Sequence, residues 1–105
     1  MDVVALLKEG GFKTTQMMWY PKQAPNLPYV VLVPLPTENM FADSRLYKKI
    51  APYHIELYQR ERDVPTEKRL EAILNEARIP WERYHSTDEN GMVVIAVYTV
   101  TLTEE

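Results

Sequence analysis

The stretch that decides the fold is WERYHSTDENGMVVIAVYTVTLT, residues 81–103. Two runs rich in β-branched and aromatic residues, 81–87 and 92–103, flank the turn residues Asp88-Glu89-Asn90-Gly91. An Asn-Gly pair between two such runs is typical of a tight β-hairpin turn. The sequence therefore predicts that the two runs form neighbouring antiparallel strands.

The second of these strands is apolar on both faces. One face would consist of Met92, Val94, Ala96, Tyr98, Val100 and Leu102. On the other face, half of the residues are also apolar, namely Val93, Ile95 and Val97. A covering layer of helices accounts only for the first set. The second set needs another layer, from the N-terminal helix, from a proline-rich loop or from a neighbouring subunit.

Two helices are expected to pack on this sheet. Asp2 can cap a short helix that Gly10 and Gly11 would end. A longer helix begins near Asp63 and Pro65. Its apolar stripe consists of Leu70, Ile73, Leu74 and Ala77, and we assign Glu67, Lys68, Glu71, Asn75 and Glu76 to the solvent side.

Three further strands are expected between the helices. They are 14–20, which Pro21 ends; 29–33, which is apolar on both faces; and a long strand around residues 53–58. In the long strand Tyr53, Ile55 and Leu57 alternate with His54, Glu56 and Tyr58. Most of the eight prolines lie between Pro21 and Pro36, so the connection there is expected to be stiff and extended.

Two segments near the middle of the chain are less regular. Residues 37–45 lack periodicity and are expected to form a loop, although Met40 and Phe41 stand side by side in it. Pro52 cannot donate to a ladder, so 46–51 is expected as an edge, a bulge or a separate arm. The whole pattern predicts one α+β domain over residues 1–105, with a mixed or antiparallel sheet of four to five strands. Two helices pack on it, in the order α-β-β-β-α-β-β.

Composition narrows the class of protein. The chain has 105 residues, 46% apolar and 26% charged, which is typical of one globular domain. It has no cysteine, so disulfides and thiol chemistry are excluded and a reducing cytoplasm is favoured. Residues 1–10 do not read as a signal peptide, and the longest apolar run, 92–98, is too short to span a bilayer, so we expect a soluble protein with no membrane partner.

Charge is uneven along the chain. Residues 1–50 carry six basic and four acidic groups, and residues 51–105 carry six and eleven. No basic stripe exists to neutralise phosphates, so specific nucleic-acid binding is not expected. If the charges of the two halves lay on opposite surfaces of the molecule, they would favour head-to-tail or ring stacking of subunits. The simpler interpretation is that these charges are solvated and have no role in assembly.

Residues for chemistry are scarce. His54 and Glu56 share a strand face but supply only two metal ligands, and His85 with Asp88 is interpreted as turn polarity. Neither Ser44 nor Ser86 lies in a nucleophile elbow, and the glycine pair ends a helix rather than starting one, so no phosphate loop is expected. We therefore expect no catalytic residue, no metal and no cofactor.

The apolar and aromatic side chains are more informative about function than the polar ones, because some of them are candidates for protein contacts. Met17, Met18, Trp19 and Tyr20 are consecutive, so an alternating strand turns two of them away from the core. These residue types are favoured at protein contacts, although a small second core under the proline-rich loop explains them equally well. Tyr47, Lys48 and Lys49 form a short cationic patch that suits base stacking or a subunit interface.

Three stretches resemble a family of small phage and prophage proteins that act in tail completion, tail termination or head-tail joining. They are Tyr20-Pro21 with Ala24-Pro25-Asn26-Leu27-Pro28-Tyr29 before a valine strand, Asn39 with Ala42-Asp43 before a tyrosine, and Ile55-Glu56-Leu57-Tyr58 before an acidic helix. The closing hairpin is also similar. The resemblance extends over nearly the whole chain.

This resemblance implies a structural role without bond chemistry. Subunits of such proteins close into a ring, commonly hexameric, on the tail tube; the ring stops tube polymerisation and offers a surface to the head connector. The implied partners are copies of the chain itself, the tail-tube protein and a head-connector or closure protein. The implied location is the bacterial host cytoplasm during assembly and then the head-tail junction of the virion.

Alternatives to the terminator role stay open at the level of sequence. A head-closure, connector or minor tail component has the same features. A ferredoxin-like ligand-binding or regulatory module uses the same elements but would stay small and show a concave polar pocket. An enzyme is the third alternative and would need His54 or His85 as its base.

The resemblance also suggests contact residues. The segment Asn39, Met40, Phe41, Ala42 and Asp43 is the first candidate for subunit or tube contact, and Arg45 and Tyr47 flank it. Lys48, Lys49, Trp19 and Tyr20 complete the predicted interface. Glu56 and Tyr58 are assigned to packing and solvation of the strand. Pro52 departs from the family pattern, because it interrupts the long strand where the resemblance implies an unbroken one.

Overall fold

A computed structural model describes residues 2–17, 25–35, 38–42 and 45–104; for 38–42, 45–51 and 102–104 the description is of the backbone. The elements are α1 (Val3–Glu9), β1 (Thr14–Gln16), β2 (Tyr29–Pro34), β3 (Glu38–Ala42), β4 (Arg45–Gln59), α2 (Val64–Glu76), β5 (Trp81–Thr87) and β6 (Val94–Glu104).

The strands form one mixed sheet. Its order is β1-β2-β4-β6-β5, with β3 pairing β4 beside this path. The β1–β2 pair is parallel, and every other pair is antiparallel. The predicted α+β class is confirmed, and the five strands of the main path with the two helices follow the predicted order α-β-β-β-α-β-β.

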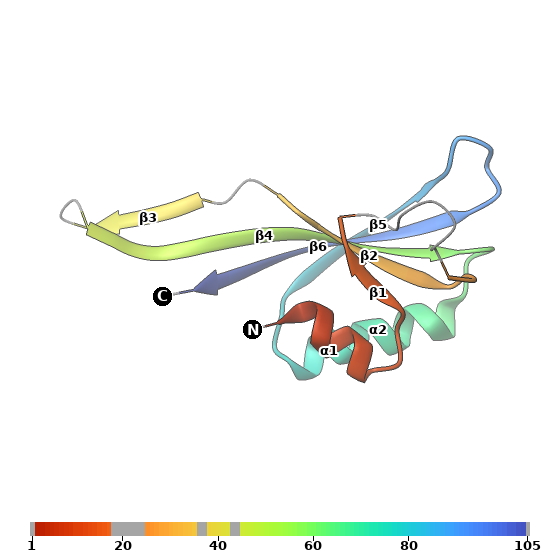
Figure 1. The fold of residues 1–105 in the computed structure, drawn as a ribbon, viewed down its shortest axis with the longest axis horizontal. Helices are drawn as coiled ribbons and strands as arrows, with labels where there is room; N and C mark the ends of the chain where they lie inside the picture. Colours follow the sequence, from red (N-terminus) through yellow and green to blue (C-terminus); the bar gives the residue numbers. More distant parts are fainter. Residues whose placement is uncertain (1, 18–24, 36–37, 43–44, 105) are drawn as a thin grey trace.

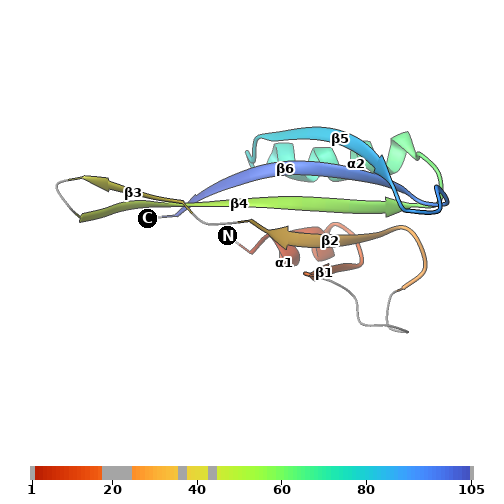
Figure 2. The same ribbon diagram turned by 90° about the horizontal axis from the view of Figure 1, so that it is seen from above.

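Both helices cover the same face of the sheet. Figure 1 shows α1 and α2 beneath the strands, and in Figure 2 the strands lie across them. The core between the two layers consists of Val3, Leu7, Phe12, Val30, Leu32, Ile55, Leu57, Leu70, Leu74, Ile79, Ala96, Tyr98 and Val100. Asp2 and Asp63 cap the helices as predicted, since their carboxylates accept from the N–H groups of Ala5 and Thr66.

One assignment on α2 was wrong. Glu67, which we expected on the solvent side, is 1% exposed and faces the sheet. It precedes Leu70 by three residues and Leu74 by seven, so it continues the buried stripe of the helix. Glu71 is also turned inward, because its carboxylate accepts a hydrogen bond from the Tyr98 hydroxyl at 2.7 Å.

Two strand boundaries also differ from the prediction. β1 ends at Gln16 because Met17 adopts a positive φ of 74°, which is incompatible with a strand; residues 18–20 of the predicted strand lie outside the described residues. At the other end of the chain, β6 starts at Val94. Met92 belongs to the turn instead, where its N–H donates to Asp88 Oδ1, and its side chain is 71% exposed.

The molecule is elongated because one hairpin projects from the body (Figure 1). Its principal extents are 50 × 28 × 23 Å. Residues 38–42, expected as loop, form β3, and β4 continues without interruption through Pro52 to its start at Arg45. We call β3 together with residues 45–50 of β4 the arm.

Pro52 is tolerated inside β4 because of where its nitrogen points. The Pro52 carbonyl accepts from the Leu35 N–H at 3.0 Å, so this residue faces the β2–β3 side of β4. The ladder on that side breaks between Pro34, opposite Tyr53, and Glu38, opposite Ile50. The missing N–H of the proline therefore falls at the break, where the two strands β2 and β3 are joined.

Candidate functional site

The sheet face opposite the helices is the first candidate surface. Since α1 packs on the same side as α2, it does not supply the second covering layer that we expected over the other face of β6. We call this surface the open face; it is formed by Tyr29, Val31, Val33, His54, Glu56, Tyr58, Tyr84, Ile95, Val97 and Thr99. Val31 and Val97 at its centre are only 5% and 4% exposed, whereas Tyr84 is 52% exposed. The apolar surplus on β6 is therefore smaller than the sequence predicts.

Aromatic contacts organise the open face. The rings of Tyr29 and Tyr58 stack with centroids 5.0 Å apart, and the Tyr58 hydroxyl donates to Glu56 Oε1 at 3.0 Å. Burial, followed by the Glu56 carboxylate, raises the pKa of Tyr58 above its ordinary value. His54 meets Tyr84 edge to face at 6.4 Å. The predicted shared face of His54 and Glu56 is confirmed, but each side chain contacts a tyrosine.

The arm is the second candidate surface, and it gathers most of the predicted contact residues. In its register Asn39 lies opposite Lys49, Met40 opposite Lys48, and Phe41 opposite Leu46. The register shifts between Met40 and Phe41, so Tyr47 is the extra residue of a β-bulge on β4. Of the other predicted residues, Arg45 begins β4, while Trp19, Tyr20 and Asp43 lie outside the described residues.

A buried polar cluster was missed by the sequence analysis. The Glu67 carboxylate accepts from Gln59 Nε2 at 2.9 Å, and His85 Nε2 lies 3.2 Å from both of its oxygens. Arg83 Nη1 and Arg62 Nε approach it at 3.5 and 3.7 Å. These groups join α2 to β4 and β5. The helical spacing from Glu67 to Leu70 and Leu74 was the signal that could have revealed it.

A second polar contact lies beside this cluster. Glu71 Oε2 accepts from the Tyr98 hydroxyl and pairs with Arg83, which thereby bridges two carboxylates of α2. Tyr98 is fully buried, and burial, followed by Glu71, raises its pKa above the ordinary value. Both oxygens of Glu67 and Oε2 of Glu71 contact polar groups of this chain. The arrangement fixes the helix to the sheet and offers no activated nucleophile.

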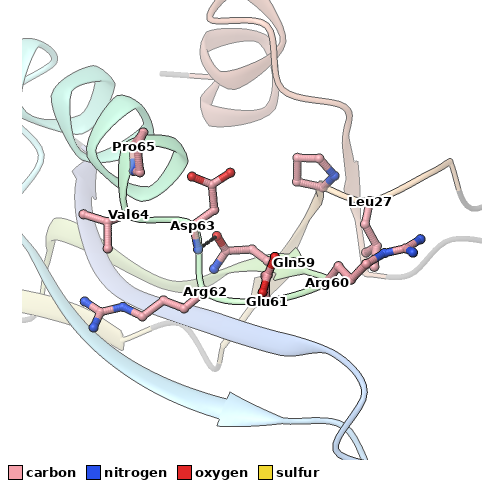
Figure 3. A pocket seen from close by; sticks show the side chains of 9 residues that line it. Leu27, Gln59, Arg60, Glu61, Arg62, Asp63, Val64 and Pro65 are labelled. Atoms are coloured by element: carbon pink, nitrogen blue, oxygen red, sulfur yellow. Dashed lines mark hydrogen bonds between the residues drawn. The ribbon is translucent and has the colours of Figure 1, made fainter.

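A pocket of about 490 Å³ opens where β4 meets α2. Leu27 and Pro28 form one wall, and residues 59–65 form the other. Figure 3 shows Arg60 and Arg62 pointing to opposite sides, and the Asp63 N–H donates to Gln59 Oε1 at 3.1 Å. Glu61 and Asp63 balance the two arginines, so the pocket has no excess charge with which to select an anion or a cation.

His85 is not a turn residue as interpreted, although Asp88 is. Asp88 Oδ1 accepts from the N–H groups of Met92 and Val93, which closes the turn as predicted. Among the residues with described side chains, no three His, Asp or Glu side chains gather as a metal site. In the same part of the chain, neither helix has the length and apolar character needed to cross a membrane.

Comparison with known proteins adds no relative. A scan against protein-family models and a search of curated proteins each found no match for this chain.

Proposed function

We propose that this chain is a structural phage or prophage assembly protein that, like the tail terminators it resembles, closes the end of a tail tube as a ring. It acts by recognition and closure and is not an enzyme. Its partners are copies of itself, the tail-tube protein and a head-connector protein. It would assemble in the bacterial cytoplasm and remain at the head-tail junction of the virion.

The observation that carries this proposal is the arm. It extends beyond the region covered by α1 and α2 (Figure 1), and it contains eight of the predicted contact residues, at positions 39–42, 45 and 47–49. Beyond Lys49, where the pairing with β6 ends, the arm is a two-stranded ribbon, and an isolated ribbon of this kind is only marginally stable in water. We therefore expect the arm to contact another molecule. The resemblance implies that this molecule is the tail tube or a neighbouring subunit.

The polar side chains also favour a structural role. The two histidines contact Tyr84 and Glu67, and Glu67 and Glu71 hold α2 against the sheet. A general base must be able to reach a substrate proton, but the His85–Glu67 contact instead joins a strand to a helix. These contacts position elements of the fold, which suits a protein that works through its surface.

The pocket between Leu27 and the start of α2 supports one alternative, a small ligand-binding or regulatory module. Such a module would bind its ligand as a monomer and leave the arm without a role. Titration of the purified chain with a library of small metabolites, followed by thermal unfolding, distinguishes the two: a stabilising ligand bound by a monomer favours the module.

Electron microscopy after deletion of the gene tests the proposal. Loss of a terminator should give tails of irregular and excessive length, because nothing stops tube growth. Normal tails with unjoined heads would instead indicate a head-side connector. Normal, fully joined particles would contradict any role in tail completion. Gene order is a second check, since a place between head-completion genes and the tail-tube gene is expected and a metabolic operon is not.

A further inference from the structure

The base of the arm has two strand edges that pair with no strand among the described residues. On one side β3 pairs, among the described strands, with β4 alone, so its outer side has no described partner strand. On the other side β5 accompanies β6 only as far as the Trp81–Val100 pair, so no described strand lies along the outer side of Thr101–Glu104. We call these the β3 edge and the β6 edge. Such edges are templates for pairing with another chain.

The backbone groups on the β3 edge follow from the register. In an antiparallel ladder the N–H and C=O of one residue point to the same side, and successive residues alternate. Pro52 faces the β2–β3 side, so Ile50 and Lys48 do as well. Their partners Glu38 and Met40 therefore face β4, and Asn39 directs its N–H and C=O outward. The same alternation along β3 directs those of Phe41 outward.

The β6 edge is assigned in the same way. The Asp88 N–H donates to the Val93 carbonyl at 3.1 Å, so odd-numbered residues of β6 face the β5 side. Thr101 and Thr103 lie beyond the end of β5 on that side. Their N–H and C=O groups point outward, so each edge offers the backbone groups of two residues.

The two edges are complementary in direction. Both β3 and β6 run antiparallel to β4, so they run parallel to each other on opposite sides of it. A second copy in the same orientation can place its β6 edge beside the β3 edge of the first, as a parallel pair. This contact uses both edges of every copy, whereas a two-fold β3–β3 contact would leave every β6 edge unpaired.

Each edge carries one charged residue, Glu38 or Glu104, but lacks the two residue types that most often prevent such pairing. Residues 38–42 and 101–104 contain no lysine and no proline. The β-bulge that could distort the β3 edge has its extra residue, Tyr47, on β4 instead. Neither α1 nor α2 lies against the arm (Figure 1), and an isolated two-stranded ribbon is marginally stable in water, so added strands would stabilise it.

We propose that the β3 edge of one copy pairs with the β6 edge of the next, so that the arms join head to tail into one sheet that continues around a closed ring. The partner is a second copy of this chain. This inference deepens the assembly role proposed above and rests on it for the expectation that the repeating contact closes into a ring.

Proline scanning of the two edges tests the pairing. Asn39→Pro and Thr101→Pro each remove one outward N–H and leave the pairing with β4 in place. Asn39→Ala and Thr101→Ala are the matched controls, because they shorten the same side chains and keep the N–H. Native mass spectrometry should find oligomers for the wild type and both controls. Each proline variant alone should be a monomer, and their equimolar mixture should give heterodimers that grow no further, because only one good edge of each copy remains.

Several outcomes would overturn the pairing. Homodimers of Thr101→Pro would indicate β3–β3 contact, and a wild type that stays monomeric would exclude self-pairing. If a proline variant loses its folded circular-dichroism spectrum, hydrogen exchange of the wild type decides: the amides of Asn39, Phe41, Thr101 and Thr103 should gain protection on association. Protection confined to the open face would contradict the proposal.

The pairing and the tail role can fail separately. Heterodimers in the mixture, together with normal tails after gene deletion, would uphold edge pairing and remove the tail function. Overlong tails with a monomeric protein would uphold the tail function and remove edge pairing.

Discussion

The buried Glu67 cluster yields a quantitative prediction for the stability of the fold. Glu67→Ala leaves Gln59 Nε2, on a side chain that is 2% exposed, without its acceptor. An unsatisfied buried donor costs about 1–3 kcal/mol. Arg62, Arg83 and His85 are 29–52% exposed in their side chains, so they can turn to water and leave no buried unpaired charge. The cost should therefore stay below the roughly 3–5 kcal/mol of a fully broken buried ion pair.

We expect Glu67→Ala to lower the free energy of unfolding by about 2–3 kcal/mol, because the cluster loses its acceptor as well as its charge. Glu67→Gln keeps an amide oxygen for Gln59 and should cost about half as much. At roughly 5 °C per kcal/mol for a domain of this size, the Tm falls by about 10–15 °C and about 5–8 °C.

Thermal unfolding followed by far-ultraviolet circular dichroism measures both shifts. Glu76→Ala is the matched control, because Glu76 lies on the same helix but is exposed, and it should change the stability by less than about 0.5 kcal/mol. If Glu67→Ala shifted the Tm no more than this control, Glu67 would not be a structural acceptor and the reasoning would be wrong.

Three further predictions concern the core, its pH dependence and a turn. Leu70→Ala removes a fully buried side chain of α2 and should cost about 2–5 kcal/mol in urea unfolding; a loss below 1 kcal/mol would contradict the assigned core. Tyr98 has a raised pKa, so above about pH 10 the unfolded state loses its proton first and stability should fall by up to about 1.4 kcal/mol per pH unit. Tyr98→Phe should remove this part of the alkaline slope, whereas Glu71→Gln should keep most of it because burial is the main cause; an unchanged slope in Tyr98→Phe refutes the assignment. Gly11→Ala should lower the stability by about 1 kcal/mol because Gly11 has a φ of +92°, and an equally stable variant would show that this conformation is not required.

Local periodicity was sufficient to predict the body of the fold. The Asn-Gly turn with its flanking strands, the alternation in residues 53–58 and the stripe through Leu70 and Leu74 all reflect which face meets the core. The helix caps could also be predicted, because Asp2 and Asp63 accept hydrogen bonds from backbone N–H groups only three residues away. These features are local, so sequence alone determines them.

The errors involve partners that are distant in sequence. Glu67 is buried because Gln59, Arg83 and His85 approach it from two strands, and charge alone suggested a solvent position. β3 has no periodicity of its own and is a strand because β4 supplies its partners. The arm gathers residues 39–41 and 45–49, but the sequence could not predict how far it projects or which edges remain free, because both depend on where β2 and β5 end.

Sedimentation of the purified chain, alone and mixed with isolated tail tubes, tests the central claim most directly. Self-assembly through the arm predicts a discrete species whose mass is a whole multiple of the 12.3 kDa subunit, together with binding at tube ends. A single 12.3 kDa species at every protein concentration, with no sedimentation alongside the tubes, would contradict it.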